Sequence, residues 1–206
     1  MLFRGIAILL VTLVMLCSGR LAAAELMLWR VADGQTSVPV VYLLGSIHML
    51  PASAYPLDAA YEKAYQESRM VVFETDMAAL SELDAQMALI KNAAYADGSG
   101  LSQNISTDLY SATVQAAEKI GFPIRVCDMA EPWFCAMNLQ VFSLARLGYS
   151  PELGIDQHFW NKAEKDGKRL MFFEPVDRHM HLLTEMPDDM AVNMLRLTIR
   201  DMKKYS

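Results

Sequence analysis

The chain has 206 residues, of which 18 are basic and 24 acidic, so its formal net charge is −6. This acidic balance argues against a nucleic-acid partner, which would need a basic surface. A chain of this length can bury a sizeable core and is most simply one domain. After the first two dozen residues, no run is long and apolar enough to cross a membrane.

The N-terminus has the order of a secretory signal peptide. Arg4 supplies positive charge, residues 5–17 form an apolar run, and small residues lead up to Ala24. We therefore predict a signal peptide over residues 1–24, cleaved after Ala24, and one domain over residues 25–206. The protein is expected to be periplasmic or secreted, with no stable membrane insertion after cleavage.

Two other interpretations of the N-terminus are less favoured. The apolar run is shorter than the roughly 20 residues that span a bilayer, which disfavours a retained membrane anchor. A lipoprotein would use Cys17, but Leu16 before it is not the small residue that a lipobox requires.

Two cysteines, Cys127 and Cys135, follow the predicted cleavage site. Export would permit a disulfide between them. Within one unbroken helix their Cα atoms would lie roughly 12 Å apart, too far for a bridge, but Pro132 between them would start a new helix. A bridge is therefore geometrically open, and so is a pair of small buried hydrophobic side chains. No CxxC pair exists, which argues against a zinc site.

The remaining chain begins with a predicted β-hairpin and then alternates helices with short strands. Residues 26–31 and 38–44 are β-prone and are separated by the turn signal Asp33-Gly34. Hydrophobic periodicity predicts helices over residues 57–68, 77–94, 107–120, 132–147, 156–165 and 178–204, the last divided at Pro187. Short apolar runs predict strands over residues 70–73, 124–127 and 170–173. All-apolar strands are usually covered by helices on both faces, so we expect a layered α/β fold with a mainly parallel sheet.

Three apolar segments end in a residue with acid–base or metal-binding chemistry. The segments are YLLGSIH, which ends at His48, RMVVFE, which ends at Glu74, and RLMFFE, which ends at Glu174. Ligands of parallel α/β sheets bind outside the carboxyl ends of the strands, so these three side chains could meet in one site. Alternatively, both glutamates only stabilise the N-termini of the helices that follow. Gly45 would allow a close approach of backbone or ligand just before His48.

Five motifs together resemble the TraB/GumN family, also called TraB/PrgY, which is related to the Tiki proteases and to the erythromycin-esterase and ChaN-like proteins. They are GSIHMLP at residues 45–51, VVFETD at 71–76, EPW at 131–133, LGID at 153–156 and GKRLMFFEP at 167–175. The resemblance covers nearly all of the predicted mature chain. It implies a divalent-metal site in an α/β fold, with His48, Glu74 and Glu174 as ligands and Gly45, Trp133 and Asp156 as supporting residues.

The sequence departs from the family pattern in two places. The family usually has a second GxxH motif after the Glu174 segment, whereas this chain ends at Ser206 without one, so the resemblance implies a domain that is incomplete at its C-terminus. His179 stands where the family commonly has glutamine. His179 and His181 stand at i, i+2 positions, which face different sides of a helix, so they are poor joint ligands. We interpret these two residues and His158 as surface or packing histidines.

These observations predict a metal-dependent hydrolase of the peptidase or esterase type. A divalent ion on imidazole and carboxylate lowers the pKa of its bound water. His48 would be a ligand, one of Glu74 and Glu174 would be another, and the second carboxylate would take the proton of the water. Mixed nitrogen and oxygen ligands fit Zn, Mn, Co or Fe alike. The peptide or small-molecule substrate is not specified.

The alternative to an enzyme is an exported binding or regulatory protein on the same scaffold. Trp133, Phe134 and Trp160 could line its ligand pocket, although aromatic residues at helical spacing more often pack into a core.

Overall fold

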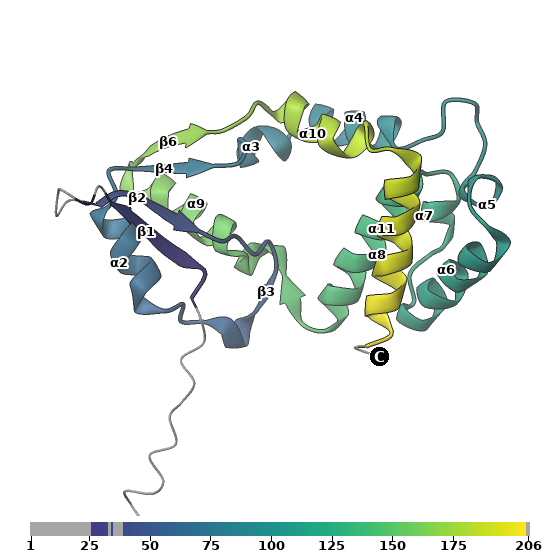
Figure 1. The fold of residues 1–206 in the computed structure, drawn as a ribbon, viewed down its shortest axis with the longest axis horizontal. Helices are drawn as coiled ribbons and strands as arrows, with labels where there is room; N and C mark the ends of the chain where they lie inside the picture. Colours follow the sequence, from purple (N-terminus) through teal and green to yellow (C-terminus); the bar gives the residue numbers. More distant parts are fainter. Residues whose placement is uncertain (1–25, 33, 35–38, 205–206) are drawn as a thin grey trace, which may run out of the picture. The chain divides into compact units, whose positions relative to one another are not determined.

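The computed structural model describes residues 26–32, 34 and 39–204, and the predicted signal peptide lies outside them. The chain is mixed helix and strand, which confirms the α/β class. It divides into two units, with the boundary after Gly45, and Figure 1 labels the elements of both. Among the described residues, no helix combines the length and the apolar character that crossing a bilayer requires.

The described part of the first unit is the predicted hairpin. Strand β1 (Leu28–Ala32) pairs antiparallel with β2 (Pro39–Leu44), while Asp33 of the expected turn lies outside the described residues. The register places Trp29 opposite Leu43 and Val31 opposite Val41, and all four side chains are exposed. Cross-strand partners share one face of a sheet, so the hairpin presents an apolar face.

The second unit is mostly helical. Its helices are α2 (Ala59–Glu67), α3 (Met77–Leu80), α4 (Leu83–Asn92), α5 (Leu101–Asn104), α6 (Thr107–Ile120), α7 (Arg125–Asp128), α8 (Pro132–Arg146), α9 (Ile155–Asp166), α10 (Val176–Thr184) and α11 (Asp188–Met202), with 3-10 turns η1 (Ala52–Ala54) and η2 (Pro151–Leu153). Side chains cap several of them: Asp58 accepts from the backbone at the start of α2, and Asp76 does so at α3. Gly121 ends α6 in the left-handed region, at φ 71°.

Two short strand pairs complete the described part of this unit. Strand β4 (Met70–Phe73) runs parallel to β6 (Arg169–Phe172), in a register that pairs Phe73 with Phe172. Strand β3 (Leu50–Pro51) runs antiparallel to β5 (Tyr149–Ser150). Within the described residues, parallel pairing is therefore confined to β4 and β6.

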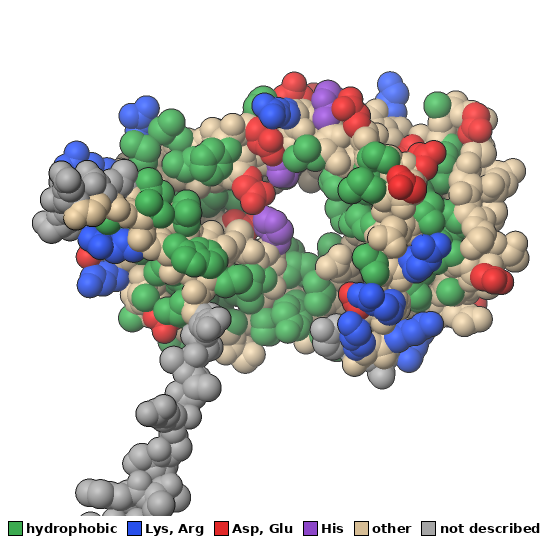
Figure 2. All heavy atoms as spheres, in the orientation of Figure 1, with side chains coloured by type: hydrophobic (Ala, Val, Ile, Leu, Met, Phe, Trp, Pro, Cys, Tyr) green, Lys and Arg blue, Asp and Glu red, His purple; other side chains and the backbone are tan. Residues whose placement is uncertain are grey.

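The β4–β6 pair is covered by helix on one face. Trp160 of α9 contacts the rings of Phe73 and Phe172, with centroid distances of 5.3 and 5.9 Å. On the other face, Val72 and Met171 are 40% and 39% exposed. Hydrophobic side chains accordingly reach the surface over this strand pair (Figure 2). The expectation that helices cover both faces of these apolar strands is wrong for the described residues.

Two predicted elements need correction. The helix expected over residues 77–94 is interrupted, because Ser81 ends α3 and a new helix begins after Glu82. The strand expected over residues 124–127 is wrong, since residues 125–128 form helix α7. A four-residue apolar run has no detectable period, so it does not distinguish a strand from one helical turn.

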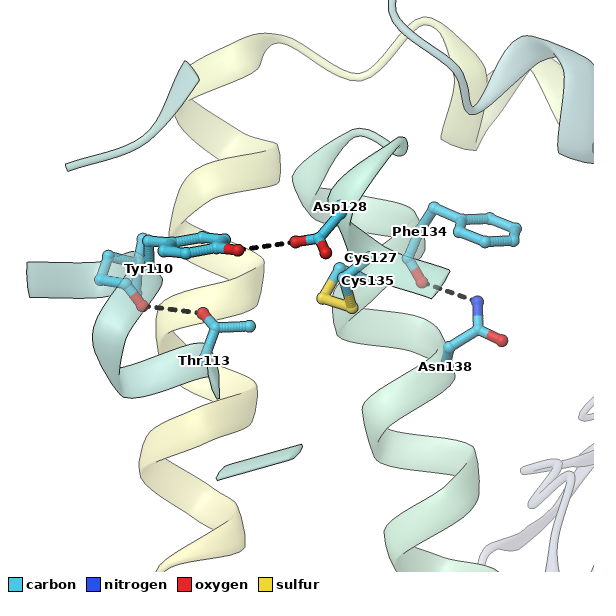
Figure 3. The surroundings of a disulfide bond; sticks show 8 residues. Tyr110, Thr113, Cys127, Asp128, Phe134, Cys135 and Asn138 are labelled. Atoms are coloured by element: carbon cyan, nitrogen blue, oxygen red, sulfur yellow. Dashed lines mark hydrogen bonds between the residues drawn. A yellow bond between two sulfur atoms is a disulfide. The ribbon is translucent and has the colours of Figure 1, made fainter. Parts of the chain in front are cut away.

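The main core lies among α6, α8 and α11 and contains a disulfide between Cys127 and Cys135, whose Cα atoms are 4.8 Å apart (Figure 3). Pro132 starts α8 between the two cysteines, so they do not belong to one continuous helix. Nearby, the Tyr110 hydroxyl donates to Asp128 at 2.7 Å. This bond and the disulfide fix α7 to its neighbours.

Candidate functional site

His48 lies in a loop that is hydrogen-bonded to the start of α9. Strand β2 ends at Leu44, so His48 follows four residues later rather than at the strand end itself. The backbone N–H of Ile155 donates to the carbonyl of Ile47 at 2.9 Å. A Cβ on Gly154 would lie only 2.5 Å from the carbonyl oxygen of His48. Glycine at position 154 therefore permits the close approach of these two segments.

Asp156 holds the imidazole of His48. Its Oδ2 lies 2.6 Å from His48 Nδ1, and its Oδ1 accepts a hydrogen bond from the Ser46 hydroxyl at 2.5 Å. The side chain of Asp156 is 16% exposed, whereas that of His48 is 73% exposed. The ring is thus anchored through Nδ1 by a mostly buried carboxylate, and Nε2 is left for a ligand or a proton.

The pKa values of this pair follow from the contact. The hydrogen bond to Asp156 raises the pKa of His48; burial opposes the rise, and the negative charges of Asp156 and Glu74 add to it. Burial works to raise the pKa of Asp156, but the hydrogen bonds from His48 and Ser46 outweigh it, so this pKa lies below its ordinary value. Asp156 is therefore a carboxylate at neutral pH.

The two predicted glutamates follow the carboxyl ends of neighbouring parallel strands. Glu74 comes directly after β4, and Glu174 follows β6 with one residue between. The backbone N–H of Glu174 donates to the carbonyl of Glu74 at 3.0 Å. The parallel pairing of the two strands therefore brings these backbones together, as the strand-end argument predicts.

Their carboxylates have different partners. The negative charge of Glu74 is the smallest of the causes that raise the pKa of His48. Glu174 accepts a hydrogen bond at 2.7 Å from Nδ1 of His179, and its other oxygen lies 3.9 Å from Nε of Arg178. On the face in view, histidine side chains lie next to acidic ones (Figure 2).

The donors present are of the right kind for a divalent metal, but they are not gathered in one shell. Imidazole nitrogen and carboxylate oxygen suit several transition metals, and a carboxylate on the second ring nitrogen is typical of metal-binding histidines. Among the residues that the structure describes, no group of three or more His, Cys, Asp or Glu side chains is placed to hold an ion. His48 and Glu74 are donors of this chemical kind, and the carboxylate of Glu174 is bonded to His179.

A model of the TraB/PrgY/gumN family matches residues 27–206. The chain belongs to this family. Searches of curated proteins and of solved structures give no match. The family assignment confirms the resemblance drawn from the five sequence motifs. The contacts described above join two of those motifs, GSIHMLP and LGID, through the bonds from Ser46 and His48 to Asp156.

Two other residues of the family motifs lie away from this contact. Gly45 belongs to the hairpin unit: its N–H donates to Met27, and a Cβ at position 45 would lie 2.9 Å from the Cβ of Met27. Trp133 is fully buried in a small core cluster, and its indole N–H donates to Glu131 at 2.8 Å. The EPW motif therefore packs helix α8 into the core.

Sequence reasoning missed three contacts of the site. It marked Asp156 only as a supporting residue and did not anticipate Ser46 or His179 as partners. The Asp156 contacts span more than 100 residues, which no local pattern reveals. The fact that His179 follows the Glu174 strand end by five residues was a usable signal.

The part of the chain around the site holds one buried hydroxyl without a hydrogen-bond partner among the described residues. This is Thr75, between Glu74 and Asp76, whose side chain is 4% exposed. A separate hollow of about 510 Å³ lies between α8 and α11. Its lining is mainly Met and Leu and includes none of the predicted site residues.

Proposed function

We propose that this member of the TraB/PrgY/gumN family is an exported metal-dependent hydrolase of the peptidase or esterase type. The observation that supports the proposal is the exposed His48 ring, anchored through Nδ1 by the mostly buried Asp156. Histidines that bind metals commonly donate their second ring N–H to a carboxylate in this way. This pairing leaves Nε2 of His48 as the ring nitrogen that can bind a metal ion.

In this proposal His48 and Glu74 hold a divalent ion, one of Zn, Mn, Co or Fe, because an imidazole nitrogen and a carboxylate oxygen suit all of these metals. When bound, such an ion lowers the pKa of water and polarises a carbonyl oxygen, which is the chemistry of metal-assisted hydrolysis. Glu174, whose backbone N–H donates to the carbonyl of Glu74, would serve as the base that takes the proton of the attacking water.

Asp156 and Ser46 act as positioning residues. Asp156 keeps the Nδ1–H tautomer of His48, and Ser46 fixes the second oxygen of Asp156 so that the carboxylate cannot rotate freely. An amide at position 156 would keep the shape but lose the charge that favours this tautomer. We expect Asp156→Asn to weaken metal binding roughly 10–100-fold.

Export is the second part of the proposal. It is supported by the positive, apolar and small-residue segments of residues 1–24, and it places the protein in the periplasm or outside the cell. The disulfide between Cys127 and Cys135 is compatible with an oxidising compartment.

Calorimetric titration of the purified full chain with Mn²⁺ tests the metal site. The parent and His181→Ala should bind Mn²⁺, whereas His48→Ala should not, and all three should remain folded. His181 is a matched control because it is an exposed histidine of α10 whose side chain is not used in the proposed site. Hydrolysis of p-nitrophenyl acetate and of a fluorogenic peptide should then depend on Mn²⁺ and on Glu174.

The same titration distinguishes the proposed hydrolase from the alternative, a non-catalytic binding or regulatory protein. A parent that is folded but binds none of Mn²⁺, Zn²⁺, Co²⁺ or Fe²⁺ would contradict the hydrolase proposal. It would favour a non-catalytic exported binding or regulatory protein on the family scaffold.

A further inference from the structure

The hollow between α8 and α11 has the size of a small-molecule site. Its volume of about 510 Å³ falls within the range of roughly 300–1,000 Å³ that is usual for ligand pockets. Leu144 and Leu147 of α8 line it together with Met190 and Met194 of α11. Because methionine is unbranched and adaptable, such a wall can fit a flexible apolar chain.

Several apolar side chains of this lining are accessible to solvent. Met190 is 58% exposed, Leu147 is 47% exposed and Leu197 is 38% exposed, and all three line the hollow. Exposed apolar side chains that are grouped in one place, rather than scattered singly, are a feature of binding surfaces. A ligand that covers them gains free energy by removing apolar surface from water.

Basic side chains gather at one end of the hollow, where α6, α8 and α11 all end. Leu147 and Met202, at the ends of α8 and α11, both line the hollow. Arg146 donates to the carbonyl of Ile120, the last residue of α6, at 2.8 Å. Figure 2 shows Lys and Arg side chains together over the C-terminal end of α11. The three helix ends carry Lys119, Arg146, Arg200, Lys203 and Lys204 against Glu118 and Asp201. This end is therefore cationic, in a chain whose net charge is −6.

Asp201 is the one carboxylate among the described residues that line the hollow, and it is already paired with two cations. Its Oδ1 lies 3.0 Å from Nε of Arg200 and 2.8 Å from Nζ of Lys204. A guanidinium has five N–H groups and an ammonium has three. Arg200 and Lys204 can therefore hold Asp201 and a second carboxylate at the same time.

We propose that the hollow binds one long-chain fatty acid, with its acyl chain among the Met and Leu side chains and its carboxylate beside Arg200 and Lys204. A fatty acid combines one flexible apolar chain with one negative charge, which matches an apolar hollow with one cationic end. An amphipathic helix of a partner protein, about 10–12 Å across with its side chains, is too bulky for a hollow of this volume. The proposal is independent of the hydrolase proposal, because none of the described lining residues belongs to that site.

Fluorescence titration of the purified full chain with cis-parinaric acid tests the proposal. One molecule per chain should bind, and palmitate should displace it. Hexadecanol has a chain of the same length but no negative charge, so it should compete about fivefold more weakly than palmitate, as exposed charge pairs allow.

A substitution in the lining tests the place of the acyl chain. Met190→Glu should weaken the binding of parinaric acid at least about tenfold, because it sets a charge among the side chains that cover the acyl chain. Met129→Glu is the matched control, since Met129 is 77% exposed and is not among the described lining residues. It should bind like the parent.

A second pair of variants tests the place of the carboxylate. Arg200→Gln/Lys204→Gln should weaken palmitate binding about fivefold or more and leave hexadecanol binding unchanged. Lys63→Gln/Lys91→Gln removes the same charge from α2 and α4 and should change neither. Basic residues at helix C-termini also stabilise the helix, so thermal unfolding of each variant shows that folded proteins are compared. If Met190→Glu does not fold, the charge variants still decide the proposal.

Each of four results would overturn the proposal. Equal binding by the parent and a folded Met190→Glu would place the fatty acid elsewhere on the chain. Hexadecanol that competes as strongly as palmitate would show that the cationic end has no part in binding. Displacement of parinaric acid by phosphatidylglycerol vesicles but not by palmitate would make a membrane surface the partner. Absence of parinaric acid binding by the folded parent would leave the hollow without this ligand and the hydrolase proposal untouched.

Discussion

Gly154→Ala is the most direct test of how His48 is held. The backbone of Gly154 has φ −59°, which alanine adopts without strain. Replacing glycine by alanine at such a position ordinarily stabilises a protein by about 0.4–1 kcal/mol through the unfolded state. Any loss of stability must therefore come from the atoms that the new methyl group meets.

Those atoms are backbone and cannot rotate away. The added Cβ would lie 2.5 Å from the carbonyl oxygen of His48 and 2.8 Å from its carbonyl carbon, and ordinary contact begins near 3.4 Å, so the segments must part by about 0.9 Å. If that displacement falls on the 2.6 Å contact between His48 and Asp156, the hydrogen bond is lost. Overpacking of this kind costs roughly 1–3 kcal/mol.

Urea denaturation and NMR titration measure the two consequences. We expect Gly154→Ala to lower the free energy of unfolding by about 1–3 kcal/mol. The raised pKa of His48 should also fall back toward its ordinary value of 6.5 as the contact with Asp156 is lost. Gly34→Ala is the control, because its Cβ would meet nothing within 4 Å. A Gly154→Ala protein as stable as the parent, with His48 unchanged, would refute the close approach of the two segments.

Three further predictions concern other parts of the chain. Burial raises the pKa of Glu62, but hydrogen bonds from a lysine and a histidine of α9 outweigh it and lower the pKa below 4.5. The stability that ionised Glu62 contributes is therefore present above pH 4.5 and lost as the pH falls through the lower folded value, so urea midpoints of the parent and Glu62→Gln should differ at pH 7 and converge in acid. Mass spectrometry of the exported protein should find Glu25 as the first residue, and an intact Met1 in the membrane fraction would contradict export. Replacing Cys127 and Cys135 together by alanine should lower the free energy of unfolding by about 2–3 kcal/mol, measured in urea, and an unchanged midpoint would count against the bridge.

Elements with a strong local signal were predictable from the sequence. Helix α6 has the bounds expected from its periodicity because Gly121 ends it in the left-handed conformation. Strand β4 also has the expected bounds. The exposure of Val72 was not predictable, because an all-apolar strand implies two covered faces, and the sequence does not reveal which face remains open.

The site was predictable in part, for a similar reason. Glu74 and Glu174 come together because parallel strands present their carboxyl ends at one edge, which is a rule that a sequence can express. The bond between His48 and Asp156 joins residues 108 positions apart and depends on the packing of two loops. The bond between Glu174 and His179 depends on the angle at which α10 leaves the strand, which the residue spacing does not specify.

Each of the three tryptophans of the chain lies in a different region, so tryptophan fluorescence can report on the three regions separately. Trp29 of the hairpin is 56% exposed, Trp133 of α8 is fully buried, and Trp160 of α9 is 6% exposed beneath the β4–β6 pair. Fluorescence of proteins that keep one tryptophan, with phenylalanine at the other two positions, would therefore follow three regions separately. If the strand pair that carries Glu74 and Glu174 opens before the helical core melts, the Trp160 signal will change first, and the transitions will not coincide.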